Sequence, residues 1–137
     1  MKKIYIIIGL LIAIIVFSYY FSPTIKIFTG GNIRYAEQDK RAYNLLTDDI
    51  IKNCPRISHD YEFGYATVDG PAIEVSAITF RNTTDISRVH EYLLSLNFKL
   101  DRKVESGEYW TSDNSDKTVH ISTIEFPETT IIEVLKK

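Results

Sequence analysis

Apolar and polar positions divide the chain into three stretches. Residues 4–21 form an unbroken apolar run of 18 residues that contains no charge. Over residues 35–53, apolar side chains recur three or four positions apart, which is the spacing of one helix face. From Tyr61 onward, several segments alternate between apolar and polar residues, as half-buried strands do. The pattern predicts a long apolar helix, an amphipathic helix and then a domain rich in strands.

The amphipathic helix predicted over residues 35–53 carries its apolar side chains on one side. They are Ala42, Leu45, Leu46, Ile50 and Ile51, with Tyr43 beside them. Pro55 follows, and a proline disfavours helical backbone at the residue before it, so we expect the helix to end there.

Residues 60–68 and 72–80 predict a β-hairpin around a turn at residues 69–71, which reads Asp-Gly-Pro. In the first strand, Tyr61, Phe63 and Tyr65 share one face, because successive strand residues point to opposite sides. A second helix over residues 85–96 follows, with Thr84 or Asp85 as its cap and Asn97 as a left-handed residue after it.

Four more strands are predicted at the carboxyl end, over residues 98–104, 108–112, 118–125 and 130–135. The turns between them are short, which favours antiparallel pairing. Two helices cannot cover both faces of a sheet this size. The expected fold is therefore α+β: an N-terminal transmembrane helix, followed by a two-layer sandwich of an antiparallel sheet with both helices on one face.

The apolar run is long enough to cross a membrane as a helix. Its 18 residues span roughly 27 Å, close to the thickness of the hydrocarbon core of a bilayer. Tyr19, Tyr20 and Phe21 suit the headgroup level, and Pro23 is expected to end the helix. Cleavage after Ser18 is the competing interpretation, but it lacks the usual pair of alanines. We therefore expect a retained signal anchor over residues 1–23, a linker over 24–32 and one domain over 33–137.

The basic residues that flank the run predict its orientation. The amino group of Met1, Lys2 and Lys3 precede the run, whereas Lys26 and Arg34 follow it more widely spaced. Because positive flanks stay inside, the amino terminus is expected in the cytoplasm. The chain is then expected to be a single-pass membrane protein whose body lies on the outer side of the membrane, periplasmic or extracellular.

The charge of the body narrows the class of partner. All 18 Asp and Glu follow Gly31, together with 13 of the 16 Lys and Arg, so the body carries a net charge of −5. Nucleic acid is not expected as a partner, because phosphate binding needs clustered Lys and Arg. The single cysteine, Cys54, excludes an intramolecular disulfide and a zinc site built on paired cysteines.

No catalytic motif, cofactor or metal site is predicted. The three histidines, His59, His90 and His120, are not spaced as metal ligands on a helix. A small membrane-anchored hydrolase stays open as an alternative if His59 and His120 meet near an aspartate in the fold.

Aromatic residues on the strands, with glutamates nearby, are the candidate partner-binding residues: Tyr109, Trp110, Glu105, Glu108, Tyr61 and Tyr65. These aromatic rings either pack under the helices or form an exposed face for a protein partner. Acidic neighbours suit a basic partner.

In size, anchor and acidity, the chain resembles small anchored or exported immunity proteins, which bind and block a toxin outside the cytoplasm. The resemblance implies a non-catalytic, immunity-type inhibitor of a basic toxin or enzyme. An accessory subunit of a membrane complex is a further alternative, although the apolar run lacks small-residue motifs for helix packing.

Overall fold

The computed structural model describes residues 1–29, 31–68 and 70–137, with residues 23–29 described by their backbone alone. The chain divides into two units, Met1–Gly31 and Asn32–Lys137. The predicted turn over residues 69–71 is described only from Gly70 onward, because Asp69 lies outside the described residues.

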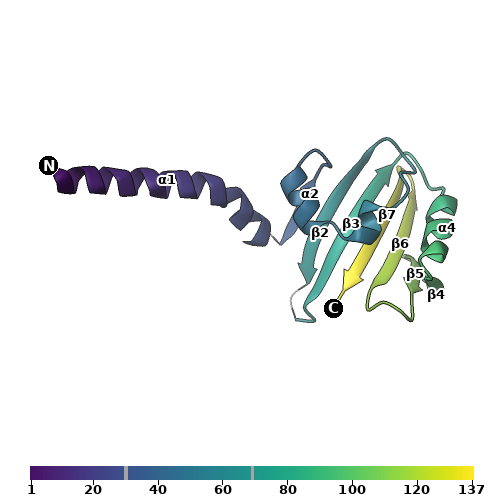
Figure 1. Ribbon diagram of the computed structural model, residues 1–137. Helices are drawn as coiled ribbons and strands as arrows, with labels where there is room; N and C mark the ends of the chain where they lie inside the picture. The colour runs from purple at the N-terminus through teal and green to yellow at the C-terminus, as the bar shows by residue number, and fades with distance from the viewer. Residues whose placement is uncertain (30, 69) are drawn as a thin grey trace. The chain divides into compact units, whose positions relative to one another are not determined.

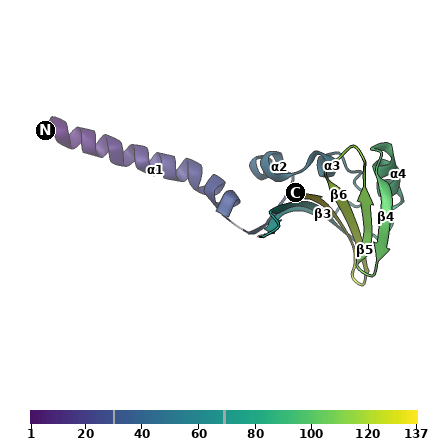
Figure 2. The same ribbon diagram turned by 90° about the horizontal axis from the view of Figure 1, so that it is seen from below.

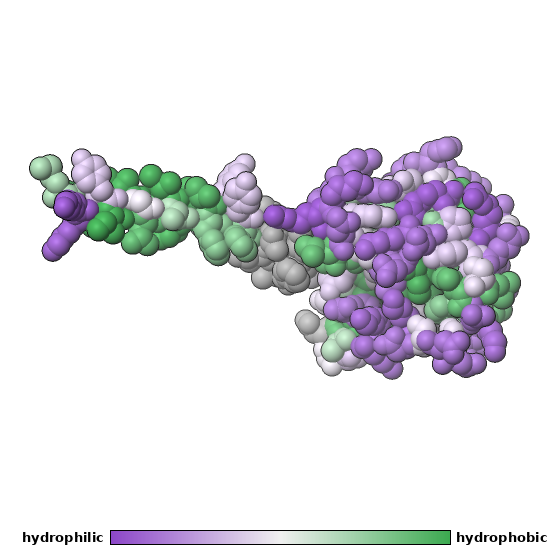
Figure 3. Space-filling model, in the orientation of Figure 1, coloured by the Kyte–Doolittle hydropathy of each residue, from purple (hydrophilic) through white to green (hydrophobic). Residues whose placement is uncertain are grey.

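The first unit is the helix α1, Lys2–Thr29. The stretch Lys2–Ser22 is long and apolar enough to cross a membrane or to serve as a signal sequence, and none of it is buried. Figure 3 shows hydrophobic residues along this helix, whereas the visible side of the second unit is mostly hydrophilic. The prediction that Pro23 ends the helix is wrong. Proline lacks only one helical hydrogen-bond donor, and its fixed φ is compatible with helix, so the backbone continues to Thr29.

The second unit is built on one antiparallel sheet of seven strands, in the order β1-β2-β3-β7-β6-β5-β4 (Figure 1). The strands are β1 Asn32–Tyr35, β2 Tyr61–Val68, β3 Ile73–Arg81, β4 Lys99–Val104, β5 Gly107–Thr111, β6 Thr118–Glu125 and β7 Glu128–Lys136. The last six agree with the predicted strands to within two residues at each end. The chain enters the sheet through the edge strand β1, which was not predicted.

Three short helices, α2 Lys40–Leu46, α3 Asp49–Lys52 and α4 Ser87–Ser95, lie on the same side of the sheet (Figure 2). The predicted α+β fold with helices on one face is thus confirmed. The residues expected to form one helix over 35–53 instead form β1, α2 and α3. Thr47 is extended, and the carboxylates of Asp39 and Asp48 accept hydrogen bonds from the backbone N–H of Ala42 and Ile50, so each aspartate starts a helix of its own.

The second predicted helix forms as α4, and its end is also as expected. Asn97 has a φ of +62°, the left-handed conformation that often ends helices. At its start, Asp85 accepts a hydrogen bond from the backbone N–H of Ser87, 3.0 Å away, and Ile86 occupies the cap position. Val89 and Leu93, four residues apart, are buried against the sheet side.

The core lies between the sheet and these helices. Its strand residues alternate with partly buried ones and include Phe63, Ile78, Phe80, Val119, Ile121, Ile132 and Val134, each at most 2% exposed. The helices contribute Ala42, Leu46, Ile51, Val89 and Leu93. Burial of large aliphatic and aromatic side chains on this one side makes it the hydrophobic layer that holds the domain together.

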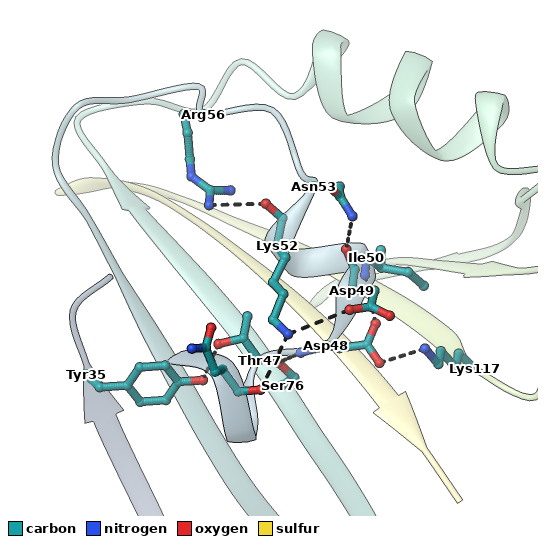
Figure 4. A network of polar contacts seen from close by, with 11 residues as sticks. Tyr35, Thr47, Asp48, Asp49, Ile50, Lys52, Asn53, Arg56, Ser76 and Lys117 are labelled. Carbon is teal, nitrogen blue, oxygen red and sulfur yellow. Dashed lines mark hydrogen bonds and ion pairs between the residues drawn. The ribbon is translucent and has the colours of Figure 1, made fainter. Parts of the chain in front are cut away.

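A polar network fastens the α2–α3 connection to the sheet (Figure 4). The carboxylate of Asp48 lies 2.7 Å from the ammonium of Lys117, and the backbone N–H of Asp48 donates to the hydroxyl of Ser76 at 2.9 Å. The hydroxyls of Tyr35 and Thr47 are 2.9 Å apart. These bonds satisfy polar groups that would otherwise be buried without partners, and they fix the helices over one face only.

Candidate binding surface

The second face of the sheet is not covered by any described element of the domain. We call it the open face. Its side chains alternate with those of the core, and none of them is buried. It consists of Arg34, Glu62, Gly64, Ala66, Val75, Ala77, Thr79, Arg81, Arg102, Tyr109, His120, Ser122, Ile131, Glu133 and Leu135.

A row of stacked and paired side chains crosses one half of the open face. The guanidinium of Arg102 lies 4.4 Å from the centre of the Tyr109 ring, and that ring stacks on His120 with 4.5 Å between centroids. His120 Nδ1 is 2.9 Å from the carboxylate of Glu133. These residues are direct cross-strand neighbours on β4, β5, β6 and β7. The row therefore holds an aromatic ring and a guanidinium in fixed positions on an exposed surface.

The other half of the open face is recessed at the positions where its side chains are small. Gly64 and Ala77 continue the same cross-strand row beyond Glu133, and Ala66 lies beside them on β2. Together with Arg34 and Ile131, they line a shallow groove of about 250 Å³. Gly64 approaches Ala77 without strain, since a Cβ added there would lie 3.8 Å from the Ala77 side chain.

Charges on the open face pair with one another. Glu62 lies 3.1 Å from Arg34 and 2.5 Å from Arg81, and Arg81 is also 2.9 Å from Asp60. Because these pairs are partly exposed, each contributes little to stability. With Arg102 and Glu133 counted as well, the open face carries three arginines and two glutamates, so it has no net negative charge of its own.

Two of the predicted partner-binding residues, Trp110 and Glu108, face the helices and not the open face. Trp110 is only 5% exposed, on the helix side, and its indole N–H donates to Glu108. Glu108 is also bound by His90 at 2.7 Å and by Lys103 at 3.0 Å. Burial raises the pKa of Glu108, but the hydrogen bonds from Lys103, Trp110 and His90 outweigh it and hold the pKa below its usual range. Both residues therefore belong to the packing of the sheet against α4.

Tyr61 and Tyr65 also lie on the helix side, because they share a face with the core residue Phe63. The hydroxyl of Tyr61 donates to Glu37 at 2.9 Å, and Arg56 lies 5.2 Å from its ring centre. Tyr65 is half-buried in the middle of β2. Of the six predicted residues, Tyr109 alone is on the open face, and Glu105 is exposed in the turn between β4 and β5.

The histidines do not come together. His90 Nε2 is bound to Glu108, and His120 Nδ1 is bound to Glu133. His120 Nε2 is buried and lacks a hydrogen-bond partner among the described residues. His59 is exposed in the loop that leads to β2. Within the described part of the chain, no group of three or more His, Cys, Asp or Glu side chains is arranged to hold a metal ion.

Cys54 is buried at the end of α3 and is 4% exposed. Burial raises the pKa of its thiol to about 12, against the smaller opposite effect of Arg56. Since only the thiolate is nucleophilic, this cysteine is chemically inert in the folded domain near neutral pH.

Sequence reasoning missed the groove and the row because both depend on strand register. Gly64 and Ala77 are 13 positions apart in the chain, and only the pairing of β2 with β3 makes them neighbours. No protein-family model, curated protein or solved structure matches the chain.

Proposed function

We propose that the chain is a membrane-anchored protein-binding module that binds a basic protein outside the cytoplasm through its open face. The observation that carries this proposal is the open face itself: a complete face of a seven-stranded sheet that no described element of the domain covers. An immunity-type inhibitor, which blocks a basic toxin or enzyme, is the specific role that fits best.

The dimensions of the open face suit a protein. Seven strands at the usual spacing make it about 29 Å wide, and strands of four to nine residues are about 13–30 Å long. The resulting area approaches the roughly 800 Å² that each partner contributes to a standard protein interface. Small-molecule sites are instead concave and enclosed, whereas the groove here is shallow.

The side chains of the open face provide an anchor for binding. Tyr109 is a rigid aromatic ring already held between Arg102 and His120. Tyrosine and arginine are the residue types that contribute most often to interface hot spots. Because the row is preorganised, little side-chain entropy is lost when a partner covers it.

The domain charge of −5 favours a basic partner by accelerating the encounter, even though the open face itself carries three arginines and two glutamates. The proposed location follows from α1. We take it to be retained as an anchor, with Lys2 and Lys3 on the cytoplasmic side and the domain outside.

A capture experiment with residues 32–137 as bait tests this proposal. The bait variant Ala77→Arg places a long charged side chain at the centre of the open face, and Leu45→Arg makes the same type of change on α2, where Leu45 is 56% exposed. We expect the wild type and Leu45→Arg to capture the same basic protein, and Ala77→Arg to lose at least tenfold of it.

Circular dichroism melts of the three baits control for folding. Equal capture by Ala77→Arg and the wild type would show that the open face is not the binding surface. Turnover of a small ester or glycan that depends on one histidine would contradict the binding-module proposal and support the hydrolase alternative.

A further inference from the structure

One end of the sheet carries exposed apolar side chains. Phe126, in the turn between β6 and β7, is 94% exposed, and Ile124 at the end of β6 is 46% exposed. Val104, at the start of the neighbouring β4–β5 turn, is 42% exposed. A shallow pocket of about 240 Å³, lined by residues 103–108 and Thr123, lies between the two hairpins. We call Val104, Ile124 and Phe126 the apolar tip.

Packing within the domain does not account for the exposed apolar side chains of the apolar tip. An aromatic side chain gains stability by burial, and Phe126 is almost fully in solvent. A single exposed apolar residue needs no explanation, but three at one end of a domain mark a candidate contact surface.

Three glutamates surround the apolar tip: Glu105 in one turn, and Glu125 and Glu128 on either side of Phe126 and Pro127. All three are exposed, and none has an ion-pair partner among the described residues. Elsewhere in the domain, Glu62 is paired with arginine and Glu108 with Lys103. The nearby Lys103 is itself paired with Glu108. The tip therefore combines an apolar centre with an uncompensated negative rim.

We propose that the apolar tip is the specificity contact for the basic partner: Phe126 enters an apolar pocket on that protein, and Lys or Arg side chains at the pocket rim meet the three glutamates. This inference rests on the proposed function and names a second contact for the same partner. Ile124 lies on the same side of β6 as His120 and Ser122, so the tip extends the open face at one end.

Charge favours a basic protein over two other candidates for contact with the apolar tip, a lipid surface and a second copy of the chain. An anionic lipid surface repels three carboxylates, so the tip is not a membrane contact. A second copy of the chain that docks tip to tip would bring six carboxylates together, which is also unfavourable. A partner with an apolar pocket and a basic rim satisfies both features of the tip.

The test uses the full chain in isolated membranes of cells that make it, with the photoreactive residue benzoylphenylalanine at one position at a time. Position 126 probes the tip. Position 94 on α4 is the matched control, because Leu94 is an exposed apolar residue, 58% exposed, on the helix side. Position 77 probes the open face. We expect one protein adduct at 126 and at 77, and at least tenfold less at 94.

Charge is tested by replacing Glu105, Glu125 and Glu128 together with Lys, and in a second variant with Gln. The adduct at 126 should fall at least tenfold with Lys and less with Gln, and higher salt should reduce it in the wild type. A protein adduct at 77 but none at 126 would overturn this inference and leave the proposed function standing. No protein adduct at either position would overturn both. An adduct with lipid, with a second copy of the chain, or one indifferent to the glutamates would also overturn the tip contact.

Discussion

Replacing Gly107 with alanine is expected to lower the free energy of unfolding by about 3–5 kcal/mol, or roughly 12–30 °C in Tm. Gly107 has a φ of +142°, which side chains rarely adopt. A Cβ there would lie 2.1 Å from the carbonyl oxygen of Ile121 and 3.0 Å from the Cα of Ser122. Both contacts are with the backbone of β6, so relief requires the β5–β6 pairing to shift.

Two other glycines provide graded controls for this prediction. Gly70→Ala has a strained φ of +93° but open space, so only the backbone cost of about 1–2 kcal/mol applies. Gly64→Ala meets ordinary contacts at 3.8 Å and should change stability by less than about 0.5 kcal/mol. Chemical denaturation of residues 32–137 measures all three. A Gly107→Ala domain as stable as Gly64→Ala would mean that the β4–β5 hairpin is not packed as described.

Removing residues 1–31 is expected to leave a soluble domain that keeps its fold. The core residues lie within Asn32–Lys137, which is a compact unit by itself. None of the stretch Lys2–Ser22 is buried, so its removal takes no side chain out of the core. We expect residues 32–137 to be monodisperse in size-exclusion chromatography and to melt cooperatively.

The full chain supplies the counterpart to this experiment. If α1 is retained as an anchor, the intact mass of the membrane-extracted protein includes Lys2 and Lys3. A mature protein that begins at Tyr19 would show instead that the apolar run is cleaved as a signal sequence. An aggregated truncation without a cooperative melt would show that α1 is part of the fold.

The order of strands along the chain could be read from the sequence because turns and alternation are local signals. Trp110 and Tyr109 illustrate what local signals cannot predict, namely which face of the sheet a residue occupies. Adjacent strand residues must face opposite sides, yet only the register with Val119 and His120 reveals that Trp110 faces the helices and Tyr109 the open face. The predicted aromatic cluster therefore divides between two faces.

The helix boundaries failed for a different reason. The apolar spacing over residues 35–53 continues through Thr47 and Asp48, where the backbone breaks to reach Ser76 and Lys117 on the sheet. These partners are 28 and 69 residues away from Asp48, so no window along the chain contains them. The four residues of β1 were missed because a strand this short has too few positions to display alternation.

Thiol labelling in intact cells tests whether a partner covers the open face outside the cytoplasm. Cys54 gives little background, because it is buried and its thiol pKa is about 12. A new cysteine is placed at position 77 on the open face or at position 45 on α2, and a membrane-impermeant maleimide is applied. Each labelling rate in cells is divided by the labelling rate of the same variant in the purified domain, residues 32–137, which gives a relative rate.

We predict that Leu45→Cys is labelled in intact cells at close to the rate of the purified Leu45→Cys domain, and that Ala77→Cys is labelled at least tenfold more slowly than the purified Ala77→Cys domain. Labelling of Leu45→Cys only after the cells are broken would place the domain inside and contradict the proposed orientation. Equal relative rates for Ala77→Cys and Leu45→Cys would show that nothing covers the open face, and would contradict the binding-module account.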